Sequence, residues 1–285
     1  MRVRWMLLAA LALAAPALLA GQPGKAVVEE LQGSVTVQHM QPDGSLGQPE
    51  GLGIGDEALP GDRLQTGADS SLVLTLDDGT HLELAQDSDI TLKALDEAAS
   101  GRTTLLSMAK GFFHAVVAKL EDGDRFELAT PNAVAAVKGT EWDAEIKDGS
   151  TSVGVHEGTV WMGDGSGQAS RVLAKGFIAS AGPAGLGQAR AWTEQERAAR
   201  LAFLGGLRSR RLQYIQNHPR LRQQLKRWKA RREAWRQAAL KRRLAIRKHL
   251  SEAQVPRRRA QRQKARQQHA KEREALKKEP APGEK

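Results

Sequence analysis

The stretch "SLVLTLDDGTHLELA" (Ser71–Ala85) carries the clearest structural pattern in this chain of 285 residues. On both sides of Asp78-Gly79, apolar residues alternate with polar or small ones, which is the two-residue period of a half-buried β-strand. An Asp-Gly pair between two such runs favours a tight turn, because glycine readily adopts the positive φ angles that the turn requires. The sequence therefore predicts a β-hairpin here.

The same alternation recurs through the front of the chain, in short segments that end at glycine or aspartate. Further examples are Ser34–Gln38, Asp89–Leu95, Arg125–Ala129, Thr151–Gly158 and Thr159–Gly163. Seven or more short strands with close turns predict a mainly β domain over residues 26–180, built as a sandwich-like or solenoid-like stack or as a barrel. The segment Thr103–Asp122 can be interpreted as a helix or as two strands joined at Gly111. We favour strands, because aromatic and β-branched residues follow the glycine.

The charge of the chain is divided unequally between its two halves. Residues 1–190 hold 14 basic and 25 acidic side chains, a net charge of −11, whereas residues 191–285 hold 29 and 8, a net charge of +21. The chain has no cysteine, which excludes disulfides, thiolate nucleophiles and cysteine-ligated metals. An acidic β-domain joined to a basic C-terminal region is the organisation that these numbers predict.

Residues 1–20 predict an export signal. Arg2 and Arg4 precede the apolar run Trp5–Leu19, and Leu18-Leu19-Ala20 offers a cleavage site before Gly21. The run is shorter than the roughly 20 residues that cross a bilayer and it contains Pro16. We therefore expect an exported protein of the periplasm or cell envelope, with an uncleaved N-terminal anchor as the alternative.

Short motifs follow one another along the front of the chain in a specific order. They are Gly61-Asp62, Thr66-Gly67, Asp78-Gly79, Thr130-Pro131, Gly139-Thr140 and Glu157-Gly158. In this order they resemble the FecR domain, over roughly residues 26–180. The resemblance implies an extracytoplasmic β-rich domain that is not an enzyme. The best-known members restrain a sigma factor through a cytoplasmic segment that precedes a membrane helix. Only residues 1–4 precede the apolar run here, so we expect the domain without that segment.

The stretch "TPNAVAAVKGTEWDAEI" (Thr130–Ile146) is the most recognisable part of this resemblance. Its glycine supplies a positive φ angle or a close backbone approach, and its proline fixes the entry into the apolar run. The tryptophan is expected to pack inward, with Glu141, Asp143 and Glu145 facing solvent. The residues to which we assign this structural role are Thr130, Pro131, Lys138, Gly139, Thr140 and Trp142. Lys138 stands where the family usually has arginine, and lysine cannot form the planar bidentate pair.

Catalytic signatures are missing from the sequence. It contains no nucleophile elbow, no HExxH and no P-loop. Its strand histidines, His39, His81, His114 and His156, are scattered singly, and a lone histidine is more often a surface or strand residue than a metal ligand. We therefore predict no enzyme, no metal site and no cofactor. An enzyme of unrecognised type, acting on envelope polysaccharide, is the remaining alternative.

Behind the β-domain the composition changes. A Gly/Pro linker at 181–190 precedes basic amphipathic helices at 191–255, which Thr193–Glu196 opens as a capping box. Leu221, Leu225 and Trp228 share one helical stripe with Trp235. Residues 256–285 are basic and polar on all sides, which predicts a solvated helix or disorder.

This basic region has two interpretations, namely docking on the acidic β-domain or adhesion to anionic lipid or polymer of the envelope. The candidate residues for anionic-surface binding are Arg227, Trp228, Lys229, Arg231, Arg232, Trp235, Arg236, Lys241, Arg242 and Arg243. Export argues against nucleic acid as the polyanion. We expect the β-domain to bind an unknown envelope protein, as a scaffold or, alternatively, as an anchored sensing component in signalling.

Overall fold

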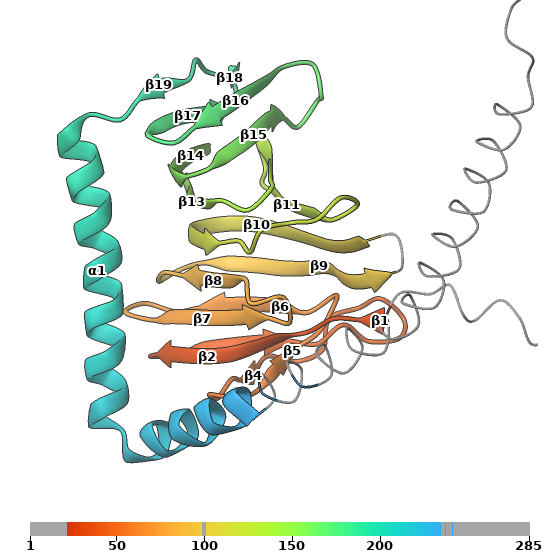
Figure 1. Ribbon diagram of the computed structural model, residues 1–285, viewed down its shortest axis with the longest axis vertical. Helices are drawn as coiled ribbons and strands as arrows, with labels where there is room; N and C mark the ends of the chain where they lie inside the picture. The colour runs from red at the N-terminus through yellow and green to blue at the C-terminus, as the bar shows by residue number, and fades with distance from the viewer. Residues whose placement is uncertain (1–21, 99–100, 235–236, 238–240, 242–285) are drawn as a thin grey trace, which may run out of the picture. The chain divides into compact units, whose positions relative to one another are not determined.

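The computed structural model describes residues 22–98, 101–234, 237 and 241 (Figure 1). The chain is mainly β and continues into basic helices, as the sequence predicts. Residues 1–228 and residues 229–285 group into two separate units. The first unit holds all the described strands and the first long helix.

Two sheets contain the strands, and they share the long strand β10 (Gly101–Val116). Sheet A runs in the order β4 (Glu50–Gly51), β3 (Val35–Gln38), β6 (Arg63–Thr66), β9 (Asp89–Ala98), β10, β11 (Arg125–Ala129), β12 (Ala133–Val137), β15 (Thr159–Asp164) and β16 (Ser170–Ala174), with β1 (Gln22–Pro23) beside β9. Sheet B runs in the order β5 (Glu57–Ala58), β2 (Ala26–Gln32), β7 (Ser71–Leu76), β8 (His81–Leu84), β10, β13 (Glu141–Lys147), β14 (Ser150–Glu157) and β17 (Phe177–Gly182), with β18 (Gly185–Leu186) and β19 (Arg190–Ala191) beside β17.

Successive segments of the chain contribute strands to one sheet and then to the other, along the length of the stack (Figure 1). The predicted hairpin is present: β7 and β8 pair in antiparallel register, and Gly79 in the turn has a φ of 88°. Alternate residues of each strand point between the sheets and form the core. Its fully buried large side chains include Leu74, Phe113 and Trp142, and burying each such side chain contributes about 1.5–3 kcal/mol.

Strand β10 passes from one sheet into the other, which settles the ambiguous segment Thr103–Asp122 in favour of strand. Up to Lys110 it pairs with β9 in sheet A, and from Gly111 onward it pairs with β13 in sheet B. Gly111 has a φ of 102°, and a Cβ there would lie 2.3 Å from Ser88 Oγ. The crossing therefore requires glycine, both for its backbone angle and for the space that Ser88 occupies.

The predicted linker is part of sheet B. Within residues 181–190, β18 pairs with β17, and β19 begins at Arg190 and pairs with the same strand. Helix α1 (Glu194–Asn217) follows, opened by the predicted capping box: Glu196 N donates to Thr193 Oγ1 over 3.2 Å, and Thr193 N donates to Glu196 Oε2 over 2.9 Å. Residues 219–234 form a second helix. Among the described residues, no helix has both the length and the apolar character to cross a membrane.

We expect Gly111→Ala to destabilise the fold by several kcal/mol, because the new methyl group combines an unfavourable φ with a clash against Ser88. Gly79→Ala is the matched control, since Gly79 also has a positive φ but a Cβ added there would meet no atom within 4 Å. Its loss should stay near 1–2 kcal/mol. Urea unfolding measures both, and equal losses would show that the contact with Ser88 is unimportant.

Candidate functional site

Helix α1 lies across the outward face of sheet B (Figure 1). Leu207 is buried and packs with Ala85 and Phe112. The Phe203 ring meets the Phe112 ring edge-to-face, with 5.0 Å between the ring centroids. The amphipathic face of α1 therefore packs on the β-domain, which is the self-docking that the sequence left open for this part of the basic region.

Arg211 is the centre of this contact. Its side chain is 4% exposed, and its Nε donates to Glu30 Oε2 over 2.9 Å while its Nη1 donates to Glu83 Oε1 over 2.6 Å. Glu30 belongs to β2 and Glu83 to β8, which lie on either side of β7. Because a buried charge is costly unless it is paired, the two carboxylates and the arginine depend on one another.

Arg200 makes a second contact nearer the start of α1. Its Nη2 donates to Glu145 Oε2 over 3.0 Å, its Nε lies 3.8 Å from Asp143 Oδ2, and its guanidinium lies 4.9 Å from the centroid of the Phe112 ring. Asp143 is only 1% exposed. The expectation that Asp143 faces solvent is therefore wrong. Its strand face points away from the core as alternation predicts, but α1 covers that face.

Beneath this part of the structure, two histidines meet Asp143. His114 on β10 pairs across the sheet with Asp143 on β13, and His156 Nε2 lies 2.6 Å from Asp143 Oδ2. The two imidazole centroids are 5.6 Å apart. A β-bulge between β13 and β14 pairs Glu141 with Glu157 and Trp142 with Val155, so His156 has no partner on β13. A bulge of this kind re-aims a side chain, and here His156 contacts Asp143.

The indole of Trp192 covers His156, with 4.8 Å between the ring centroids. A Cβ at Gly154 would lie 2.1 Å from that indole, so the glycine makes the room that Trp192 occupies. Burial lowers the pKa of His114 to about 4 by disfavouring the imidazolium, although the charge of Asp143 favours it. His114 Nδ1 and Asp143 Oδ1 are both buried without a hydrogen-bond partner in the structure.

In the sequence these histidines are isolated strand residues, and no linear motif links them. His114 and His156 become neighbours only through the register of β10, β13 and β14. His39 and His81 each lie beside one carboxylate instead, with no second histidine from the described residues. His39 Nδ1 lies 2.9 Å from Asp62 Oδ2, and His81 Nδ1 lies 3.1 Å from Glu29 Oε2.

The residues of the Thr130–Ile146 motif form a corner between the sheets. Gly139 has a φ of 79°, and a Cβ there would lie 2.9 Å from Lys119 Cα. Thr140 Oγ1 donates to the carbonyl of Thr159 over 2.9 Å, and Trp142 is fully buried. Further along the same corner, Thr130 donates to the carbonyl of Ala133, while Pro131 and Lys138 are exposed.

The proposed anionic-surface residues differ in their surroundings. Trp228 is 6% exposed and packs with Leu221 and Leu225 against the β-domain core, so its indole is not available to a membrane. Arg227, Lys229, Arg231 and Lys241 are exposed, and Arg232 is half-buried. Trp235, Arg236, Arg242 and Arg243 lie outside the described residues.

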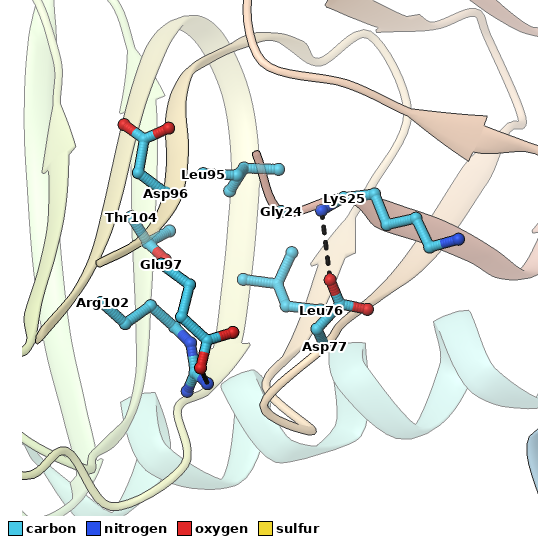
Figure 2. Close-up of a pocket in the computed structure, with 9 residues that line it drawn as sticks. All are labelled: Gly24, Lys25, Leu76, Asp77, Leu95, Asp96, Glu97, Arg102 and Thr104. Carbon is cyan, nitrogen blue, oxygen red and sulfur yellow. Dashed lines mark hydrogen bonds and ion pairs between the residues drawn. The ribbon is translucent and has the colours of Figure 1, made fainter. Parts of the chain in front are cut away.

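A separate hollow lies where Gly24 and Lys25 meet β9 and β10 (Figure 2). It is lined by Gly24, Lys25, Leu76, Asp77, Leu95, Asp96, Glu97, Arg102 and Thr104. Within this lining, the Lys25 backbone N–H donates a hydrogen bond of 3.3 Å to Asp77. Its volume of about 20 Å³ is room for a water molecule, so this hollow does not hold a small-molecule substrate.

Residues 62–161 match the family described as "FecR protein". This part of the chain is a FecR domain. The FecR domain contains His114, Asp143 and His156, whereas α1 and Arg200 lie beyond the matched residues. The resemblance seen in the sequence is thereby confirmed.

Two crystal structures of a candidate anti-sigma factor from Parabacteroides distasonis ATCC 8503 resemble the FecR-domain chain. The first has a TM-score of 0.41 and 19% identity over 49% of this chain. The second has a TM-score of 0.41 and 18% identity over the same share. The match covers 64% and 63% of those chains, which is less than two thirds of their length. No curated protein matches the FecR-domain chain.

We expect Arg211→Ala to release α1 from sheet B, because Glu30 and Glu83 would be left as half-buried carboxylates without their partner. Removing one member of a buried ion pair typically costs about 3–5 kcal/mol. Arg208→Ala is the control, since Arg208 is exposed on the same helix. Hydrogen exchange of the α1 amides should accelerate in Arg211→Ala alone. Unchanged protection in that variant would contradict the role given to Arg211.

Proposed function

We propose that this chain is a non-catalytic interaction protein of the bacterial envelope, with a FecR domain that binds a protein partner in sensing or signalling. The family match supports a regulatory module. The observation that carries the proposal is an apolar surface on sheet A, defined by Trp161, Val172, Val134 and Ala136, on strands β12, β15 and β16. We call it the Trp161 surface.

The Trp161 surface is built by strand register. Trp161 pairs with Val172 on one side and with Ala136 on the other. Trp161 is 42% exposed and Val172 is 68% exposed, which is unusual for two large apolar neighbours. A Cβ at Gly163 would lie 2.4 Å from the Trp161 indole, so the ring lies flat over its own strand and presents a broad apolar area.

The Trp161 surface also lies at the end of a sheet. Within the described part of the chain, β16 pairs with β15 and with no other strand. An edge strand offers free backbone donors and acceptors to an incoming chain. The partner that fits is therefore an extended segment of another protein, which adds a strand beside β16 and places apolar side chains near Val172 and Trp161.

We expect Trp161→Ser to abolish capture of that partner by the full chain from envelope extract after chemical cross-linking. The reason is that large aromatic side chains at the centre of an interface carry most of its binding energy. Leu201→Ser is the matched control, because Leu201 is 49% exposed on α1, away from sheet A. Circular dichroism checks that both variants fold. If the Trp161 and Leu201 variants capture the same partner equally, the surface is wrongly assigned.

The second part of the proposal concerns the basic C-terminal region. Arg227, Lys229 and Arg231 are exposed, and a basic side chain near an anionic surface contributes about 1 kcal/mol. Because Trp228 is buried against the β-domain, insertion of its indole into lipid does not contribute. We propose that the contact with anionic lipid or polymer is electrostatic and sensitive to salt.

We expect the triple variant Arg227→Gln, Lys229→Gln, Arg231→Gln to bind phosphatidylglycerol-containing vesicles at least tenfold more weakly in co-sedimentation at low salt, since three charges account for about 3 kcal/mol. The control is Arg197→Gln, Arg208→Gln, Arg210→Gln, which removes the same charge from exposed positions of α1. Equal weakening in the two variants would indicate attraction by net charge alone and would overturn the assignment to these residues.

A further inference from the structure

His114, Asp143 and His156 bring two imidazole nitrogens and one carboxylate oxygen together, all within 4.8 Å of one another. We propose that these three side chains form a binding site for a divalent transition metal ion of the zinc type, between the FecR domain and α1. The proposal departs from the expectation, drawn from the sequence, that the chain has no metal site. It stands on different residues from the Trp161 surface, so either proposal can fail without the other.

The donor set suits such an ion. Histidine nitrogen and carboxylate oxygen bind Zn²⁺ at about 2.0–2.2 Å, and three protein ligands that leave a fourth position open are a common arrangement. The ligand atoms around one ion therefore lie about 3–4 Å apart. In the structure His156 Nε2 and Asp143 Oδ2 are already 2.6 Å apart, and the largest separation in the set is within 4.8 Å. Binding of an ion would bring the three ligand atoms to about 3–4 Å from one another.

The buried atoms without partners are the second observation that indicates a ligand. His114 is 8% exposed and Asp143 is 1% exposed, yet His114 Nδ1 and Asp143 Oδ1 have no hydrogen-bond partner in the structure. A buried polar atom left unpaired costs about 1–3 kcal/mol. A cation at the cluster would give these two buried residues a partner.

The neighbouring charges decide how tightly an ion binds. Arg200 Nε lies 3.8 Å from Asp143 Oδ2, so its positive charge competes with the ion, whereas its closer contact is the 3.0 Å hydrogen bond to Glu145. Glu141 Oε1 lies 3.7 Å from His114 Nε2 and is a nearby negative charge. Because Arg200 belongs to α1, an ion in the site is coupled to the seating of that helix.

The other histidine–carboxylate pairs of the chain provide an internal comparison. The pair of His39 with Asp62 and the pair of His81 with Glu29 each contain a single histidine. Among the described residues, the group of three at His114 is the only cluster with this spacing. If a metal bound to any exposed imidazole, substitution of His39 would lower the metal affinity. Binding at the proposed site would weaken only when His114 or His156 is substituted.

The test uses the full chain after treatment with a chelator, titrated with Zn²⁺ in a calorimeter and with Co²⁺ in a spectrophotometer. We expect one ion per chain, a visible Co²⁺ absorption band, and at least a 100-fold loss of affinity in His114→Ala and in His156→Ala. His39→Ala should bind as the unchanged protein does. Arg200→Gln should bind several-fold more tightly, because a competing positive charge is removed.

Controls keep the result interpretable when a histidine variant is unstable. Circular dichroism and melting without metal identify a variant that fails to fold, and Arg200→Gln then tests the site with all three ligands intact. Absence of binding by the unchanged chain would overturn the proposal. So would Zn²⁺ binding that is lost in His39→Ala, or that Arg200→Gln leaves unchanged or weakens.

Discussion

The buried ion pairs of Arg211 hold the first unit in one arrangement. One guanidinium bridges Glu30 on β2 and Glu83 on β8, so a single helical residue spans three neighbouring strands. Arg200 lies eleven residues earlier, which is about 16 Å along a helix. From β7 to β13 there are three strand spacings, or about 14 Å. The rise of the helix therefore matches the spacing of the sheet, and both arginines reach their carboxylates at once.

Because α1 packs on sheet B, the outer faces of the two sheets differ in their exposure to solvent. On sheet B, α1 and Trp192 exclude solvent from Asp143 and His156, and polar groups that would be ordinary surface residues become a buried cluster. On sheet A, no described helix covers Trp161 and Val172, and they remain exposed. The β-domain therefore has a covered polar cluster on sheet B and an exposed apolar surface on sheet A.

The sequence predicts well where the strands lie, but it predicts only in part which of their faces are covered by other elements. Alternation with Asp-Gly turns is sufficient for β7 and β8. The sequence also predicts strand on both sides of Gly111, but not that one continuous strand passes there from sheet A into sheet B. Alternation also shows which way Asp143 points, but it does not show whether another element covers that side. The meeting of His114 with His156 depends on cross-strand register and on a bulge, which are properties of the folded sheet. The same limit applies to Trp228, whose helical stripe indicates an apolar face without indicating its partner.

The structure shows which acidic residues of the front of the chain pair with basic residues of the C-terminal region. Arg200 and Arg211 account for four of the carboxylates of the β-domain, namely Glu30, Glu83, Asp143 and Glu145. Most of the positive charge lies further along, since residues 229–285 hold 20 basic and 6 acidic side chains. The acidic groups that face α1 are already paired and partly buried, so they are poor partners for this second set of charges. Docking through Arg200 and Arg211 requires close geometric fit and should resist salt. The proposed attraction of the basic region to an anionic surface is a separate interaction, which requires only proximity and would be screened by salt.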